Sequence, residues 1–277
     1  MQEIILDTIF DCLKILPFLF IAFLIIEFFE HKLSHKSENT IKKAGKFGPL
    51  IGSILGALPQ CGFSVLATNL YITRIISLGT LIAIYLSTSD EMLPILIAEN
   101  APLNSILLLV AIKIIIGLVC GFIIDLIIRK EEPREHFEIC EHDHCDCEHG
   151  IIIPAIKHTL KTLIFIFIIT FILNAAFHYI GEDNIKHIFD KTNFFTPFIA
   201  GLIGLIPNCG SSIILTELYI AEILPLSSAL AGLLANSGVA LLVLFKSNPD
   251  IKENLKIIGI LYFISVITGL LLKIFGV

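Results

Sequence analysis

Long apolar segments separated by short polar loops dominate the chain. They lie, by residue number, at about 8–30, 48–73, 75–98, 103–128, 152–180, 196–221, 223–245 and 255–276. A helix needs about 20 residues to cross a bilayer core of about 30 Å, so most of these segments are long enough to span a membrane. The pattern predicts an all-α polytopic membrane protein whose main surroundings are lipid. The acidic start before the first segment is unlike a cleavable signal, so we expect that segment to stay as the first helix.

Residues 49–97 and 197–245 align without a gap at a constant offset of 148 residues. Apolar helices match one another by chance, but the positions preserved here include polar and conformationally special residues. They are Pro59, Cys61, Gly62, Ser64, Thr68 and Tyr71 in the first copy, and Pro207, Cys209, Gly210, Ser212, Thr216 and Tyr219 in the second. The chain is therefore predicted to be an internal duplication, with a first membrane repeat at 1–128, a loop at 129–150 and a second repeat at 151–277.

The segments 48–73 and 196–221 carry proline, an amide and glycine at their centres, a combination that breaks an ordinary helix. Each segment either crosses once or returns as a re-entrant hairpin. Hairpins put fourteen lysines and arginines on one face and three on the other, whereas single crossings give ten and seven. The positive-inside rule favours hairpins, with loop 129–150 in the cytoplasm and both termini outside. Each half then has three spans and one hairpin, so the repeats are predicted to be inverted; two parallel four-helix halves are the alternative.

Inverted repeats bring two hairpin tips together near the bilayer midplane, where transporters of this construction hold their substrate. A broken helix frees backbone carbonyl and N–H groups, thiols add affinity for soft metals, and amides add oxygen ligands. The expected substrate-binding residues of the tips are Gln60, Cys61, Gly62 and Ser64 in the first half, with Asn208, Cys209, Gly210 and Ser212 in the second. The alternative is that the same motifs only allow close helix packing.

A second polar group of residues, 87–91, lies well inside the 75–98 segment. A carboxylate at that depth costs at least about 3 kcal/mol, so Asp90 and Glu91 are expected to face a cavity, a cation or a proton path. Their counterparts in the second copy are uncharged and follow Asn236. The site is thus predicted to be asymmetric, unless the two carboxylates lie nearer the membrane surface. Weaker candidates, each equally explained as a buried structural group, are Asn69, Lys113 and Glu217.

The loop 129–150 holds three cations and eight carboxylates, which accounts for most of the net charge of −6. The loop also concentrates metal-binding residue types, namely His136, Cys140, His142, His144, Cys145, Cys147 and His149. Imidazole and thiolate groups suit zinc and similar ions, and the lack of a C-x₂-C pair predicts an exchangeable site rather than a closed zinc finger. A solvated acidic linker with incidental histidines is the alternative. The nearly neutral remainder of the chain speaks against a nucleic-acid partner.

The paired P-x-C-G motifs, the S-D-E sequence at 89–91 and the His/Cys-rich loop together resemble the ten-transmembrane-segment heavy-metal exporter family, whose members are often labelled arsenic efflux proteins or manganese transporters. The resemblance covers nearly the whole chain, and counting each hairpin as two segments gives ten here as well. It implies an efflux protein of a bacterial or archaeal inner membrane, with functional weight on Pro59–Gly62, Asp90–Glu91 and Pro207–Gly210. Where the family tends to have glycine before the cysteine and acidic residues in the second half, this chain has Gln60, Asn208 and Asn236–Val239.

These features predict a secondary-active transporter that exports a heavy-metal or metalloid ion, either a divalent cation such as zinc, manganese or cadmium, or arsenite. No P-loop occurs in the sequence, so the energy is expected to come from a proton or sodium gradient. No enzyme activity is expected. The metal is expected as cargo rather than as a firmly assigned cofactor, and the loop 136–149 is the place where zinc or another divalent ion could be held. The alternatives are a small-anion or organic-solute permease, an intramembrane metal or thiol enzyme, and a metal sensor or storage subunit. The metal, the coupling ion and the oligomeric state stay open.

Overall fold

A computed structural model describes residues 47–58, 61–89, 92–128, 152–180 and 195–275, together with a few positions between 6 and 24. Every regular element in these ranges is helical. The helices discussed below are α3 (Gly48–Gly56), α4 (Cys61–Ile72), α5 (Leu78–Ser87), α6 (Met92–Ala98), α7 (Leu103–Ile127), α9 (Ile152–Ile180), α11 (Thr196–Gly204), α12 (Cys209–Ile220), α13 (Leu226–Ala235), α14 (Ala240–Ser247) and α15 (Ile251–Ile274).

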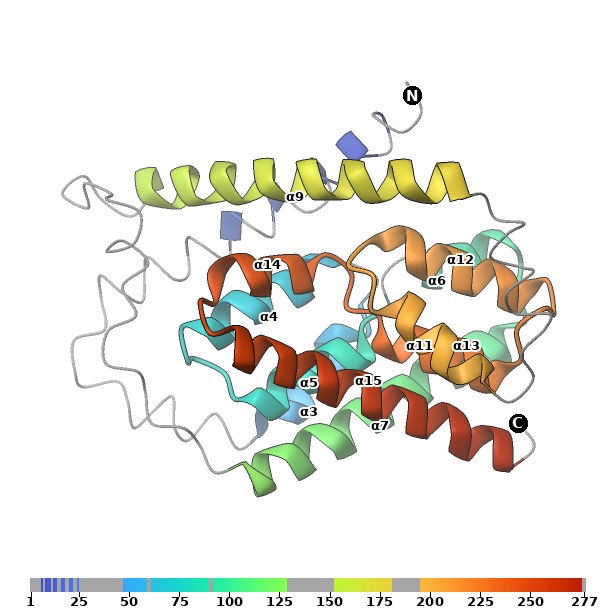
Figure 1. Cartoon of the computed structure of the whole chain (residues 1–277). Coiled ribbons are helices and arrows are strands. Elements are labelled where there is room, and N and C mark those ends of the chain that lie inside the picture. The colour runs from blue at the N-terminus through green and yellow to red at the C-terminus, as the bar shows by residue number, and fades with distance from the viewer. Residues whose placement is uncertain are drawn as a thin grey trace.

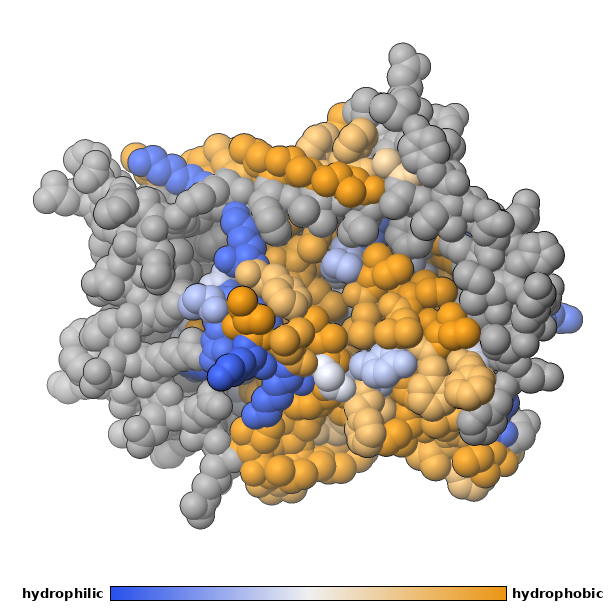
Figure 2. All heavy atoms as spheres, viewed as in Figure 1, coloured by the Kyte–Doolittle hydropathy of each residue, from blue (hydrophilic) through white to orange (hydrophobic). Residues whose placement is uncertain are grey.

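Four stretches within the described residues are long and apolar enough to cross a membrane. They are Leu78–Ala98, Leu103–Ile127, Leu226–Ser247 and Ile251–Ile274. Helices α7 and α15 expose large apolar side chains such as Leu126 and Ile274, whereas Leu226–Ser247 is almost wholly buried. Figure 2 shows apolar side chains over the face formed by α7 and α15. Exposed apolar surface of this extent needs lipid around it, and the prediction of an all-α polytopic membrane protein is confirmed.

The helix boundaries repeat along the chain. Each helix from α11 to α15 begins 148 residues after its counterpart among α3 to α7, as the start residues Gly48 and Thr196, or Leu103 and Ile251, show. The same spacing therefore continues beyond the aligned residues 49–97 and covers α7 and α15. The described parts of the two halves contain the same helices in the same order.

The two halves interlock. Helices α3, α5 and α7 pack together in the first half, and α11, α13 and α15 do so in the second. The remaining short helices pack against short helices of the opposite half: α4 packs on α14, and α12 packs on α6. Figure 1 shows α4 with α14 towards one end of the molecule and α6 with α12 towards the other. Each half thus supplies a short helix to the surroundings of the other.

Glycines permit the close packing inside each half. A Cβ atom on Gly121 of α7 would lie 2.7 Å from the carbonyl oxygen of Gly79, and one on Gly269 of α15 would lie 2.8 Å from that of Ser227. These two pairs occupy equivalent places in the repeat. A side chain at either glycine would push the spanning helix away from its neighbour, so the small residues are needed for the backbones to approach.

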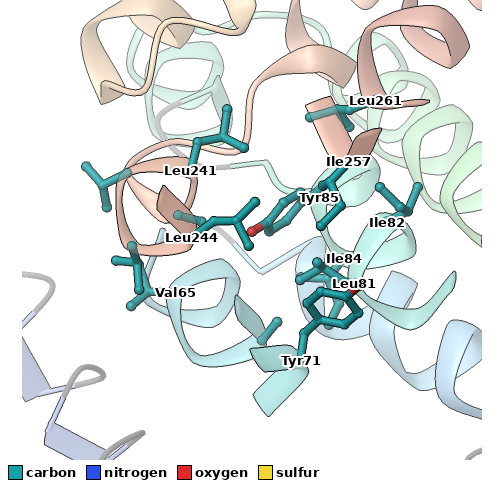
Figure 3. Packing of buried hydrophobic residues seen from close by; sticks show 14 of the residues in the cluster. Val65, Tyr71, Leu81, Ile82, Ile84, Tyr85, Leu241, Leu244, Ile257 and Leu261 are labelled. Carbon is teal, nitrogen blue, oxygen red and sulfur yellow. The ribbon is translucent and has the colours of Figure 1, made fainter. Parts of the chain in front are cut away.

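A buried apolar cluster joins the two halves where α4 and α5 of the first half meet α14 and α15 of the second. Figure 3 shows Tyr85 of α5 pointing toward Leu241 and Leu244 of α14, with Ile257 of α15 beside it. The hydroxyl of Tyr85 lies 2.6 Å from Thr68 Oγ1, so this deeply buried phenol has a hydrogen-bond partner. The core therefore includes contacts between the halves as well as contacts within them.

Candidate functional site

Each P-x-C-G motif leads into a short helix. Helix α4 begins at Cys61 and α12 begins at Cys209, after the breaks that end α3 and α11. Asn208 is fully buried and caps α12, because its side-chain oxygen accepts a hydrogen bond from the backbone N–H of Gly210 at 3.3 Å. An asparagine at this position stabilises the start of a helix. The breaks expected from proline and glycine are present, at the expected positions.

Several predicted site residues lie outside the described residues. They are Gln60, Asp90, Glu91, His136, Cys140, His142, His144, Cys145, Cys147 and His149. The helix positions of Cys61 and Cys209 are described, but not their side-chain surroundings. Among the residues that are described, no group of three or more His, Cys, Asp or Glu side chains gathers as a metal cluster would. The roles of these residues stay predictions.

The first tip meets a break in the second half. Ser64, in the first turns of α4, donates a hydrogen bond from Oγ to the backbone carbonyl of Ser237 at 3.4 Å, and both residues are buried. Ser237 belongs to the short break between α13 and α14. In the same break Asn236 accepts a hydrogen bond from the backbone N–H of Gly238 at 2.7 Å, and Gly238 has a φ of 56° that favours glycine. Two predicted substrate-binding residues, Ser64 and Asn236, are thus brought close together.

The second tip is built in the same way as the first. Ser212 is buried at the position that matches Ser64, and its carbonyl accepts from Thr216 Oγ1 at 2.7 Å, as the carbonyl of Ser64 accepts from Thr68. Helix α12 packs against α6, which follows the break after α5. Each tip therefore leads into a helix that lies against the broken helix of the opposite half.

Lys113, a weaker candidate in the sequence, lies close to the break that contains Asn236 in the structure. It lies near the middle of α7, is 1% exposed, and donates from Nζ to the carbonyl oxygen of Leu233 at 2.6 Å. Leu233 is in the last turn of α13, just before the break that contains Asn236. The signal available in the sequence was a single lysine inside a 25-residue apolar helix, where an ionisable residue marks a functional position by default.

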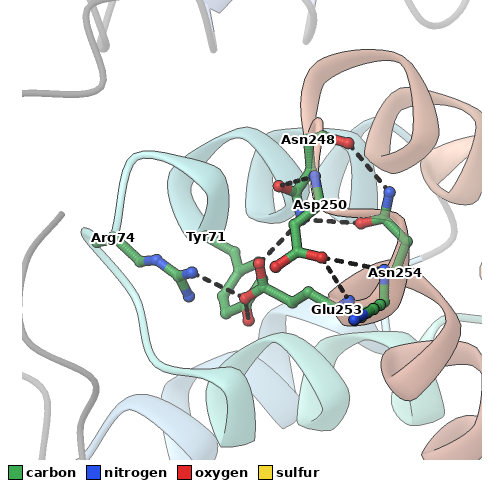
Figure 4. Close-up of polar contacts among 7 residues, drawn as sticks. Tyr71, Arg74, Asn248, Asp250, Glu253 and Asn254 are labelled. Atoms are coloured by element: carbon green, nitrogen blue, oxygen red, sulfur yellow. Dashed lines mark hydrogen bonds and ion pairs between the residues drawn. The ribbon is translucent and has the colours of Figure 1, made fainter.

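A polar cluster ties the halves together at one end (Figure 4). Glu253, in the first turn of α15, pairs with Arg74 at 2.8 Å and accepts hydrogen bonds from Tyr71 at 2.5 Å and from Asn248 at 3.1 Å. Arg74 follows α4 directly and has a φ of 61°. Burial alone would lower the pKa of Arg74, but the neighbouring Tyr71 and Glu253 oxygens raise it above its ordinary value, so the guanidinium stays charged. The end of α4 and the start of α15 therefore lie at the same end of the molecule.

A cavity of about 300 Å³ lies elsewhere, between α3, α4 and α5. Its lining is mostly apolar and includes Ile51, Leu55, Phe63 and Leu66. Such a lining suits hydrocarbon rather than an ion. The polar atoms at the breaks, rather than this cavity, are the candidate site.

Helices with an apolar exterior, interrupted by buried polar breaks, define an all-α polytopic membrane protein. A sequence model of the family described as "Putative, 10TM heavy-metal exporter" matches residues 1–177 and 144–262 of the chain. The chain belongs to this family, and the resemblance noted in the sequence is confirmed. No match was found among curated proteins or among solved structures.

Proposed function

We propose that the protein is a secondary-active transporter that exports a heavy-metal or metalloid ion across the cytoplasmic membrane. The cargo binds where the hairpin tips meet the broken helices of the opposite half. The observation that carries this proposal is the contact between Ser64 and the carbonyl of Ser237, which joins a tip to a break across 173 residues of sequence. Buried polar groups at helix breaks are the means by which membrane transporters hold ions away from water.

The proposed topology is two inverted repeats with re-entrant hairpins. It is supported by the 2.8 Å pair between Arg74 and Glu253, because a single crossing of 48–73 would put Arg74 on the side opposite to the loop 246–254. It is also supported by helix direction. In Figure 1 the spanning helix α7 ends towards the left of the view, where its counterpart α15 begins. Loop 129–150 then lies on the Arg74 side, which we assign to the cytoplasm.

Within this topology each predicted group has a distinct role. The histidines and cysteines of 136–149 collect the ion from the cytoplasm, and the thiols of Cys61 and Cys209 bind it at the tips. Asp90 and Glu91 supply charge and carry the coupling proton, unless sodium is the coupling ion. These roles rest on residue type and on the position of each motif in the sequence.

The test is cellular accumulation of zinc, manganese, copper, cadmium and arsenite in a bacterial host, measured by elemental analysis with and without the protein. We expect the protein to lower the cellular content of at least one of the five, and the Cys61→Ser/Cys209→Ser variant to lose this effect. Cys120→Ser is the matched control, because Cys120 lies in α7 and faces the apolar core. Equal content of all five elements with and without the protein would contradict the proposal.

A further inference from the structure

The break between α13 and α14 presents two hydrogen-bond donors that have no partner. Asn236 is 2% exposed and Ser237 is 1% exposed, and neither Asn236 Nδ2 nor Ser237 Oγ has a hydrogen-bond partner among the described residues. The orientation of the Asn236 amide is fixed, because Oδ1 accepts from the backbone N–H of Gly238 at 2.7 Å. Nδ2 is therefore the donor that is left over. Buried donors of this kind are rarely left unsatisfied.

The equivalent break in the first half is different. Ser87, Thr88 and Ser89 each donate from the side-chain hydroxyl to a nearby backbone carbonyl, at 2.8, 2.7 and 3.2 Å. Ser89 is the repeat counterpart of Ser237. Among the described residues of the two breaks, the unpartnered donors therefore belong to the second half.

Lys113 contributes a further hydrogen-bond donor near this break. Its ammonium group bonds the carbonyl of Leu233, one helical turn before Asn236. The ammonium also lies at the C-terminal end of α13, where the helix dipole stabilises a cation. The nearby hydroxyl of Ser64 donates to the carbonyl of Ser237, which fixes the break against α4. The two side-chain groups of this break that have no partner among the described residues, Asn236 Nδ2 and Ser237 Oγ, are therefore both able to donate a hydrogen bond.

We propose that Lys113, Asn236 and Ser237 form a donor subsite that binds oxygen atoms of the cargo. The cargo then moves as an oxygen-bearing species, a metal or metalloid hydroxide or an oxyanion, rather than as a bare divalent cation. A bare cation is held by lone pairs of oxygen, nitrogen or sulfur, which the N–H groups of an amide or an ammonium do not offer. Hydroxide and oxyanion oxygens accept hydrogen bonds from amide, hydroxyl and ammonium groups. This inference rests on the proposed export function and names the chemical class of its cargo.

The test uses the purified full-length protein in proteoliposomes and measures uptake of arsenite, arsenate, Zn²⁺, Mn²⁺ and Cd²⁺. Asn236→Asp is nearly isosteric and keeps the acceptor for Gly238, but it replaces the unpartnered donor with a carboxylate oxygen. We expect it to lower uptake of the oxygen-bearing cargo about tenfold or more. Ser237→Ala removes a hydroxyl that makes no hydrogen bond with the described residues, so a loss of uptake in this variant reports binding rather than folding. Ser265→Ala is the control, because Ser265 Oγ donates within α15 to Leu261 at 2.7 Å.

The outcomes separate the two proposals. Uptake of arsenite or arsenate by the native protein, lowered in Asn236→Asp and Ser237→Ala but not in Ser265→Ala, supports the donor subsite. Uptake of divalent cations alone, unchanged or increased in Asn236→Asp, overturns the subsite and leaves the export function standing. Unchanged arsenite and arsenate uptake in both variants also overturns it. Transport of none of the five probes by the native protein would overturn the export function itself.

Discussion

The Arg74–Glu253 pair offers a quantitative test of how the halves are joined. The charged atoms lie 2.8 Å apart, and the two side chains are 13% and 12% exposed. At an effective dielectric constant of about 20 the direct attraction is about 6 kcal/mol. Desolvation of both groups offsets most of it, which leaves about 1.5–3 kcal/mol for a charge-assisted hydrogen bond in a partly buried place. We therefore expect a coupling energy of about 1.5–3 kcal/mol between the two side chains.

The measurement is a double-mutant cycle of Arg74→Gln, Glu253→Gln and the combined variant. The free energy of unfolding is followed by far-UV circular dichroism in mixed detergent micelles. The matched control replaces Glu222 by Gln, since Glu222 is the repeat counterpart of Arg74, is exposed, and shares its positive φ at 58°. Glu222→Gln is expected to show no coupling with Glu253→Gln. Effects of Arg74→Gln and Glu253→Gln that add to within about 0.5 kcal/mol would refute the inference that this pair fastens α4 to α15.

Three further predictions test the packing and the cytoplasmic loop. Gly204→Ala puts a methyl group against a backbone carbonyl of α13 and should destabilise the protein by about 1–3 kcal/mol. Gly259→Ala should leave the stability unchanged, because there is open space around Gly259. Thermal unfolding in detergent compares the two variants. Tyr85→Phe removes the buried hydrogen bond to Thr68 and should cost about 1 kcal/mol in the same assay, and an unchanged stability would speak against that bond. Deleting residues 136–149 should slow metal export most strongly at low cytoplasmic metal concentrations. Export rates equal to those of the full-length protein at every metal concentration would contradict a collecting role for the loop.

Hydropathy predicted the helical, membrane-spanning class, and the proline, amide and glycine residues predicted the breaks at both P-x-C-G motifs. Hydropathy did not predict that the segments 75–98 and 223–245 are each divided into two helices. The reason is local chemistry: serine, threonine and asparagine side chains near these breaks bond the backbone and compete with helical hydrogen bonds. Hydropathy also placed the start of the last segment at 255. Helix α15 begins at Ile251, because Asp250 accepts hydrogen bonds from the backbone N–H groups of Lys252 and Glu253 and caps the helix.

The contacts at the candidate site could not be assigned from the sequence. No partner for Lys113 could be assigned from the sequence, because its bond to Leu233 joins residues 120 positions apart. Ser64 was preserved in the repeat, but its contact with Ser237 follows from the crossing of α4 and α14 rather than from any local pattern. Periodicity and repeats show which residues are special in each half. Which of them meet is decided by how the two halves interlock.

The most direct test of gradient-driven export is the efflux rate from cells preloaded with arsenite or a divalent metal, with and without the protein. Secondary-active export predicts protein-dependent efflux that stops when an uncoupler collapses the ion gradient. The Cys120→Ser variant is expected to keep this efflux. Efflux that is the same with and without the protein for every metal and metalloid tested, or protein-dependent efflux that the uncoupler leaves unchanged, would contradict it.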